Sequence, residues 1–308
     1  MDQAITTRTH DVESTETIDI DARTRIAAYV ALTKPRIIEL LLVTTLPAMI
    51  LAERGLPPWS LVAWTLIGGT LAAGGANAIN CYVDRDIDQV MRRTRKRPLP
   101  MHKVPPRHAL VFGALLGAAS FSLLWAMVNL ASAALAAGAL LFYVFVYTIG
   151  MKRTTPQNIV IGGAAGAVPV LVGWAAVTGT VELEAMVMFG IVFYWTPPHF
   201  WALAMRYEQD YAAAKVPMMP VVYGRRETAK HMLLYSFLLL AMCLALFSVA
   251  RLGLVYLAAS LLLNGIFIAK AWGLFRSPDT KKAWSLFRFS IYYLALMFAA
   301  VALDVLLQ

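Results

Sequence analysis

The chain has 308 residues, of which 59% are hydrophobic and 15% charged, and its formal net charge at pH 7 is +9. Soluble domains contain about a quarter charged residues, so this composition argues against an ordinary soluble protein and indicates lipid as the solvent. The excess of basic residues does not indicate nucleic-acid binding, because these residues lie between long apolar segments. Membrane orientation and an anionic substrate explain them better.

The N-terminal segment is polar, carries several acids and contains no apolar run. It lacks the hydrophobic stretch of a cleaved signal peptide, and its composition is typical of a flexible tail. We therefore expect a flexible polar tail over residues 1–28 and a single membrane domain over residues 29–308. Cys81 and Cys243 have no metal-ligand spacing and are expected in different surroundings, so neither a thiolate metal site nor a disulfide is predicted.

Nine apolar segments follow along the chain. Each is predicted to be an α-helix, because a helix satisfies its own backbone hydrogen bonds in lipid, and about 20 residues cross the hydrocarbon. The segments cover residues 37–52, 60–79, 109–127, 132–149, 159–177, 184–205, 232–250, 254–275 and 289–307. The first is short and is expected to begin earlier, near Tyr29. The sequence thus predicts an all-α membrane protein, a bundle of nine transmembrane helices.

The basic residues predict the orientation of this bundle. With nine spans, all of the 27 lysines and arginines except Arg54 and Arg251 lie on one side of the membrane. Cytoplasmic loops are enriched in Lys and Arg, so the N-terminus is expected in the cytoplasm and the C-terminus outside. The two largest connections, 80–108 and 206–231, then face the cytoplasm and predict a cytoplasm-facing cavity. Both run from acids to bases, which suggests a weak internal repeat.

Glycine spacing predicts where helices pack closely. Pairs four residues apart have the G-x-x-x-G pattern of close helix contacts. These pairs are Gly113 with Gly117, and Gly162 with Gly166.

The end of the second apolar segment carries the clearest chemical pattern. Asn80, Asp84 and Asp88 recur every four residues, so a continuous helix places them in one stripe. Their oxygens suit Mg²⁺, which takes one or two carboxylates together with substrate phosphates. Bases follow at once: Arg92, Arg93, Arg95, Lys96 and Arg97. Acids for a metal beside bases for the remaining charge indicate a diphosphate site, and the alternative is an ordinary basic loop with scattered acids.

The second large connection offers further ligands. Asp210 and Glu208 could form a second metal site or share the first, and Asp210 is favoured because Arg206, a natural phosphate partner, stands four residues before it. Lys215 adds another base. The alternative is a solvated loop without a ligand.

These motifs resemble the signature of the UbiA superfamily of intramembrane prenyltransferases. The N-x-x-x-D-x-x-x-D pattern continues as R-R-T-R-K-R-P-L-P over residues 92–100. Other segments are similar to the branch that farnesylates protohaem IX, namely residues 33–36, 152–158, 195–201 and 210–220. The resemblance runs from about residue 29 to residue 300. Many members carry D-x-x-x-D in the second connection, but Arg206 occupies its first position here, which leaves the number of Mg²⁺ ions open.

The resemblance implies a Mg²⁺-dependent enzyme of a bacterial-type cell membrane, surrounded by membrane lipid. It implies transfer of a farnesyl group from farnesyl diphosphate to a vinyl group of protohaem IX, giving haem O for haem A and terminal oxidase biogenesis. A downstream haem-modifying membrane enzyme is an implied partner. The residues expected to bind the metal and catalyse are Asn80, Asp84, Asp88 and Asp210. Those expected to bind substrates are Arg92, Arg93, Arg97, Lys152, Arg153, Arg206, Lys215, His199, Tyr147 and Trp195.

His199 is the histidine expected inside an apolar segment, after Pro197 and Pro198, which should kink or open that helix. It is interpreted either as a contact to haem iron or a propionate, or as a packed residue. Aromatic rings could steady a farnesyl cation or anchor the protein at the membrane interface. The candidates are Tyr143, Tyr147, Tyr194, Trp195 and Trp201.

Two other functions remain open. A UbiA-type enzyme acting on an aromatic quinone precursor would share the acid pattern, although the segments around Asn158 and His199 resemble the haem branch. A transporter or channel would explain the spans and a cavity, but not acids beside a cluster of bases at one membrane face. An assay with haem, farnesyl diphosphate and Mg²⁺ separates all three.

Overall fold

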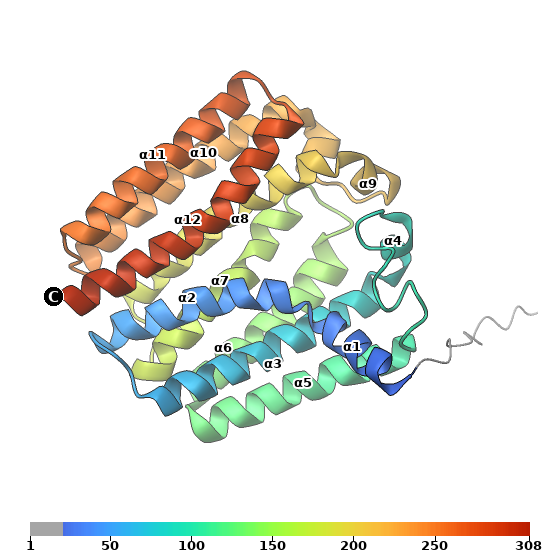
Figure 1. The fold of residues 1–308 in the computed structure, drawn as a ribbon, viewed down its shortest axis with the longest axis horizontal. Helices are drawn as coiled ribbons and strands as arrows, with labels where there is room; N and C mark the ends of the chain where they lie inside the picture. The colour runs from blue at the N-terminus through green and yellow to red at the C-terminus, as the bar shows by residue number, and fades with distance from the viewer. Residues whose placement is uncertain (1–20) are drawn as a thin grey trace, which may run out of the picture.

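The computed structural model describes residues 21–308, apart from the side chains of residues 36, 37 and 39–42. This part of the chain is helical without a β-strand, and its long helices run alongside one another as a bundle (Figure 1). The elements are α1 (Ala22–Thr33), α2 (Pro35–Glu53), α3 (Trp59–Val83), α4 (Arg85–Val90), α5 (Pro106–Met127), α6 (Leu130–Leu141), the π-helix η1 (Phe142–Met151), α7 (Asn158–Thr178), α8 (Leu183–Arg206), α9 (Glu208–Ala213), α10 (Met219–Val249), α11 (Leu254–Arg276) and α12 (Thr280–Leu307).

Every predicted apolar segment is helical, which confirms the all-α membrane architecture. Seven helical stretches in the described chain are long and apolar enough to cross a membrane: α3, α5, α6 with η1, α7, α10, α11 and α12. The remaining two predicted segments correspond to α2 and α8, which are not among those seven. The count of nine transmembrane helices therefore stays a prediction.

The first predicted helix has a different beginning from the one expected near Tyr29. α1 ends at Thr33, the next residue Lys34 is left-handed with φ of 54° and ψ of 62°, and α2 begins at Pro35. Proline suits the first position of a helix because its missing N–H needs no partner there. α1 instead packs on α3, where Asn77 Nδ2 donates to the Thr33 carbonyl at 2.9 Å. Most of the predicted tail, residues 1–20, lies outside the described residues.

Two helices extend beyond their apolar segments into polar sequence. α10 begins at Met219 and bends at Gly224, where φ is 76° and ψ is 170°. α12 begins at Thr280, and the Asp279 side chain caps it by accepting from Lys282 N at 2.8 Å. An N-terminal cap satisfies donors that the helix leaves unpaired, so the helix can start in water before it enters the apolar stretch.

Glycines bring α3 and α5 into close contact. A Cβ on Gly113 would lie 2.8 Å from the Gly75 carbonyl oxygen, so the two backbones approach directly. Gly117 packs against Leu140, and Gly162 packs against the Tyr147 ring. Three of the four glycines in the predicted spacings therefore serve close packing. Gly166 has open space where its side chain would be, so this part of the prediction is wrong.

α8 is the most enclosed helix near the site, packing against α7, α10 and α12. It continues without interruption through Pro197 and Pro198 to Arg206, so the expected opening of this helix is wrong. Neighbouring helices enclose both prolines, and such packing tolerates the backbone carbonyls that proline leaves unpaired.

The two large connections meet at one end of the bundle. α4 and α9 both lie at this end, opposite the C-terminus (Figure 1). Each is a six-residue helix that follows a long helix, which agrees with the predicted internal similarity of the two connections. The Arg93 amide donates to Asp210 Oδ2 at 3.4 Å, joining the two connections directly.

Candidate active site

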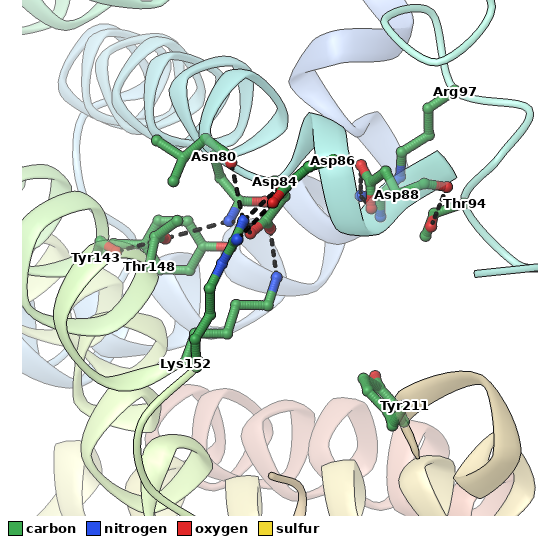
Figure 2. A network of polar contacts seen from close by, with 12 residues as sticks. Asn80, Asp84, Asp86, Asp88, Thr94, Arg97, Tyr143, Thr148, Lys152 and Tyr211 are labelled. Carbon is green, nitrogen blue, oxygen red and sulfur yellow. Dashed lines mark hydrogen bonds and ion pairs between the residues drawn. The ribbon is translucent and has the colours of Figure 1, made fainter. Parts of the chain in front are cut away.

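A buried polar cluster lies where α3 ends and α4 begins (Figure 2). Asp84 is fully buried there, and its Oδ2 accepts from Asn80 Nδ2 at 2.8 Å and from the Lys152 ammonium. Asn80 Nδ2 also donates to Thr148 Oγ1 of η1 at 3.1 Å. The cluster therefore joins the end of α3 to the π-helix, a helix type often found at functional sites.

Lys34 fixes the orientation of the Asn80 side chain. Its ammonium lies 2.7 Å from Asn80 Oδ1. Lysine has hydrogen-bond donors and no acceptor, so the amide oxygen must face Lys34 and the amide nitrogen must face Asp84. Desolvation lowers the pKa of Lys34 to about 8. In this arrangement Asn80 offers an N–H to Asp84, while its oxygen is already engaged by a base.

The predicted stripe of three ligands on one helix is interrupted. α3 ends at Val83, and Asp84 has φ −85° and ψ 3° before α4 resumes at Arg85. Backbone hydrogen bonds of 2.9 Å still link Asp84 N to the Asn80 carbonyl and Asp88 N to the Asp84 carbonyl. The two carboxylates nevertheless have different partners, because Asp88 accepts from Arg97 Nη1 at 3.0 and 2.8 Å.

A second ion pair lies at the edge of this cluster. Arg153 donates to both oxygens of Asp86 at 2.6 and 2.7 Å. This bidentate pair consists of two charge-assisted hydrogen bonds, which are stronger and more specific in geometry than a single neutral one. These hydrogen bonds lower the pKa of Asp86 to about 2. The Nη2 atom of Arg153 that donates to Asp86 also lies 3.9 Å from Asp84 Oδ1. Arg153 thus stands beside two carboxylates, one exposed and one buried.

The free oxygen of Asp84 fits a bound cation. Asp84 Oδ1 is buried and accepts no hydrogen bond from any residue that the structure describes. A buried carboxylate oxygen without a partner carries a large desolvation cost, which a metal ion or a donor from a ligand would relieve. Within the described residues no three Asp, Glu, His or Cys side chains gather as a metal site. The few carboxylate oxygens present therefore suit a cation that takes its remaining ligands from the oxygens of a phosphate-bearing substrate.

The basic residues outnumber the acids around Asp84. Three carboxylates, those of Asp84, Asp86 and Asp88, face four cationic side chains. These cations are Lys34, Arg97, Lys152 and Arg153. A site of this charge is complementary to an anion that brings a divalent cation with it.

The second connection contributes a separate set of residues. Arg93 Nη2 approaches the Tyr211 hydroxyl at 3.5 Å and its guanidinium lies over the Tyr207 ring at 5.8 Å. Asp210, predicted as a metal ligand, faces the Arg93 amide rather than Asp84. Lys215 is exposed in the turn after α9. The structure therefore joins Asp210 to the first connection through Arg93.

A cavity of about 380 Å³ opens beside α9. Three arginines line it together with residues of α9 and the start of α12: Arg92, Arg206, Arg225, Tyr207, Glu208, Gln209, Asp210 and Thr280. Arg225 donates to Glu208 at 2.7 Å and to Thr280 at 3.2 Å. The predicted bases Arg92 and Arg206 thus lie here, apart from those that contact Asp84 and Asp88.

His199 is packed between aromatic rings of α8 and α12. Its imidazole stacks on Trp195 at 4.3 Å and on Phe287 at 4.7 Å. Nδ1 lies 2.7 Å from Ser290 Oγ, whose own hydrogen is donated to the Phe287 carbonyl. The imidazole must therefore be the donor at Nδ1, which leaves Nε2 of the neutral ring with its lone pair.

The remaining aromatic candidates are also internal rather than interfacial in most cases. Trp195 and Trp201 are 3% and 1% exposed, which excludes a role as membrane-surface anchors. Trp195 Nε1 donates to the Ser290 carbonyl at 2.8 Å. The Tyr147 ring lies 5.3 Å from the Tyr143 ring at a tilt of 34°, and both tyrosines belong to η1, as does Thr148 of the polar cluster.

Two contributors to the polar cluster were not predicted. Lys34 lies 46 residues before its partner Asn80, and Thr148 lies 68 residues after it. The T-K-P-R segment carried a family resemblance, but nothing in its composition indicated a contact with Asn80. Only the packing of α1 and η1 against α3 brings these side chains together.

Comparisons with known proteins agree with this architecture. The UbiA prenyltransferase family model matches residues 41–300. A protoheme IX farnesyltransferase of Parafrankia sp. (strain EAN1pec) is 54% identical over 93% of this chain and 92% of its own length. Protoheme IX farnesyltransferase 1 of Saccharopolyspora erythraea is 56% identical over 91% of this chain and 90% of its own length.

Solved structures share the fold at much lower identity. A digeranylgeranylglyceryl phosphate synthase superimposes with a TM-score of 0.77 at 16% identity, covering 92% of this chain and all of that one. A UbiA homologue from Archaeoglobus fulgidus bound to DMAPP and Mg²⁺ gives 0.64 at 16% identity, covering 89% and 98% of the two chains. The resemblance seen in the sequence motifs is confirmed, and the chain belongs to the UbiA prenyltransferase family.

Proposed function

We propose that the protein transfers a farnesyl group from farnesyl diphosphate to a vinyl group of protohaem IX, giving haem O for haem A and terminal oxidase biogenesis. The observation that carries the proposal is the buried Asp84 beside Lys152 and Arg153, at one end of an intramembrane helical bundle. Relatives more than 50% identical over nine-tenths of the chain are named protoheme IX farnesyltransferases, which supports protohaem as the acceptor.

Asp84 and Asp88 are the residues that would hold Mg²⁺, with Asp210 as a further ligand contributed by α9. When bound, Mg²⁺ neutralises charge that develops on the leaving diphosphate. Lys152, Arg153, Arg97 and Arg93 bind the remaining phosphate oxygens with charge-assisted hydrogen bonds. Asn80 holds Asp84 in place through the 2.8 Å contact rather than ligating the cation with its own oxygen.

The residues deeper in the bundle would serve the farnesyl chain and the acceptor. Tyr147 sits next to Thr148 and presents an aromatic face that can steady an allylic cation. His199 and Trp195 line the α8–α12 side, where an apolar porphyrin would lie. Lys215 lies in the turn after α9, where it would attract the anionic substrates.

The same proposal includes the membrane arrangement. Nine helices, counting α2 and α8, cross a bacterial-type cell membrane as one domain over residues 29–308. The end that carries α4 and α9 faces the cytoplasm as the open side of the cavity, and the C-terminus is external. The product would pass to a haem-modifying membrane enzyme that acts next.

An acceptor panel tests the proposal. Purified protein is incubated with farnesyl diphosphate and Mg²⁺, and with either protohaem IX or 4-hydroxybenzoate as a representative quinone precursor, and products are identified by mass spectrometry. A hydroxyethylfarnesyl porphyrin formed from protohaem alone is the expected result. Prenylation of the benzoate with no porphyrin product would assign the protein to the quinone-precursor enzymes instead.

A further inference from the structure

The basic residues of the site fall into two spatial groups. Lys34, Lys152, Arg153 and Arg97 contact Asn80, Asp84, Asp86 or Asp88, as their hydrogen bonds show. Arg92 and Arg206 instead line the cavity beside α9, and neither forms an ion pair with a carboxylate that the structure describes. The proposed function involves two anionic substrates, and this separation offers each of them its own cations.

The Arg206 guanidinium lies over an aromatic ring. It lies 4.1 Å from the centre of the Trp284 ring and 6.0 Å from the Tyr207 ring. A cation–π contact of this kind uses none of the N–H donors in a conventional hydrogen bond, so the donors stay available for a ligand. A planar fork of donors matches a carboxylate in two parallel hydrogen bonds.

The ring beneath Arg206 is the outer end of an aromatic column. Trp284 stacks on Phe287 at 5.0 Å with 18° between planes. Phe287 stacks on His199 at 4.7 Å with 30°, and His199 on Trp195 at 4.3 Å with 20°. The column runs from the cavity into the interface of α8 and α12, so the guanidinium rests on a rigid support. Donors held in place before binding lose less entropy when a ligand arrives.

The acids of the cavity are already engaged. Glu208 accepts from Arg225 at 2.7 Å, and Asp210 accepts from the Arg93 amide at 3.4 Å. Neither therefore neutralises Arg92 or Arg206 by direct contact. The cavity therefore offers an incoming anion two cations, Arg92 and Arg206, that have no carboxylate partner among the described residues.

We propose that Arg206, with Arg92, binds the propionate carboxylates of the acceptor porphyrin, while the bases around Asp84 bind the diphosphate. The inference rests on the proposed function and assigns part of the site to one of its two substrates. Protohaem combines an apolar macrocycle with two carboxylates, which suits cations mounted at the polar end of an aromatic column. A phosphate group has the same charge chemistry, so the test must separate the two anions.

The test compares protohaem IX with its dimethyl ester, which keeps the macrocycle and removes both negative charges. Each is titrated into the full-length wild-type protein and into Arg206→Met, and binding is followed by absorbance. Farnesyl diphosphate binding with Mg²⁺ is measured calorimetrically on the same samples. We expect Arg206→Met to weaken protohaem binding about ten-fold, the size of one lost charge-assisted contact, and to leave the ester and the diphosphate unaffected.

Matched variants keep the outcome specific. Arg226→Met removes an exposed arginine of α10 that does not line the cavity, and it should leave all three affinities unchanged. Arg206→Lys keeps the charge without the planar fork and should lose only part of the preference for the diacid.

Three results would overturn the assignment. Equal losses for protohaem and its ester would make Arg206 a packing residue, and a loss confined to farnesyl diphosphate would return it to the diphosphate site. A wild-type protein that does not distinguish the diacid from the diester has no carboxylate site. If the wild type neither binds nor farnesylates protohaem, the proposed function itself fails, and that result is visible without any variant.

Discussion

Lys34 illustrates how one side chain can set the chemistry of its neighbours. Its three donors and lack of an acceptor force the Asn80 amide to present nitrogen to Asp84. These contacts support the proposal that Asn80 positions the Asp84 carboxylate, whereas its residue type alone would suggest a metal ligand. The distinction matters because the two roles respond differently to the loss of Lys34.

We expect Lys34→Met to weaken farnesyl diphosphate binding in the presence of Mg²⁺ by about ten-fold, since an amide free to rotate no longer holds Asp84 and a nearby cation is lost. Calorimetric titration of the variant with farnesyl diphosphate measures this loss. Lys34→Arg retains a donor-only side chain and should recover part of the affinity. Wild-type affinity in Lys34→Met would show that the 2.7 Å contact has no role in binding.

His199→Ala should weaken protohaem binding more than farnesyl diphosphate binding. The imidazole holds Trp195 and Phe287 together and keeps an unprotonated Nε2, so its loss changes the acceptor side of the bundle and not the Asp84 cluster. Absorbance titration with haem and a diphosphate-binding assay on one sample measure both effects. An unchanged haem affinity and spectrum would reduce His199 to a packing residue.

The sequence predicted the residues of the site better than their pairing. Asp84, Asp88 and the bases after them form a local pattern, so their shared chemistry could be inferred without a fold. The partners came from distant segments, with Lys152 reaching Asp84 across 68 residues and Ser290 reaching His199 across 91. No local pattern encodes such contacts, because they depend on which helices become neighbours.

Helices were predicted most reliably in the long apolar segments, where the lipid surroundings require the backbone to form its own hydrogen bonds. A span without water must satisfy its own backbone, so long apolar runs such as those of α5 and α7 could be identified directly. The break at Lys34 was missed, although Pro35 marked it, because the apolar sequence continues on both sides. The short helix α9 was interpreted as part of a loop because its sequence is polar. The residues of α4 were expected to continue the preceding helix, and the break at Asp84 was missed.

The crossing of α3 and α5 gives a prediction about packing. Gly113→Ala places a Cβ 2.8 Å from the Gly75 carbonyl oxygen and 2.6 Å from Ile79 Cγ1. Backbone atoms cannot move aside, so we expect a cost of about 1–3 kcal/mol and a lower midpoint of thermal unfolding. Gly166→Ala in α7 meets open space and should be neutral. Equal stability of the two variants would contradict the close crossing.

The whole molecule places its two charged connections at one end and its C-terminus at the other (Figure 1). The contact of Arg93 with Asp210 and the cavity beside α9 both lie at this end. The charge asymmetry predicts that this end faces the cytoplasm, since the predicted nine spans would place the arginines and lysines other than Arg54 and Arg251 on its side.

Reporter fusions test this orientation. After Arg97, only a reporter that requires the cytoplasm should be active. After Gln308, only a reporter that requires the external side of the membrane should be active. Pairs of reporters with opposite requirements, such as alkaline phosphatase and a fluorescent protein, provide the internal control. A cytoplasmic C-terminus would mean an even number of spans, and the nine-helix arrangement would then be wrong.

We propose that Asp84 anchors the Mg²⁺-dependent activation of farnesyl diphosphate, and diphosphate release coupled to porphyrin farnesylation in Asp84→Ala measures this role most directly. Asp84→Asn, which keeps the shape and the contacts to Asn80, serves as a second variant that preserves the fold. We predict that both variants insert and fold but lose turnover, and that EDTA abolishes wild-type activity. Full activity in either folded variant, or in wild type with EDTA, would contradict the account.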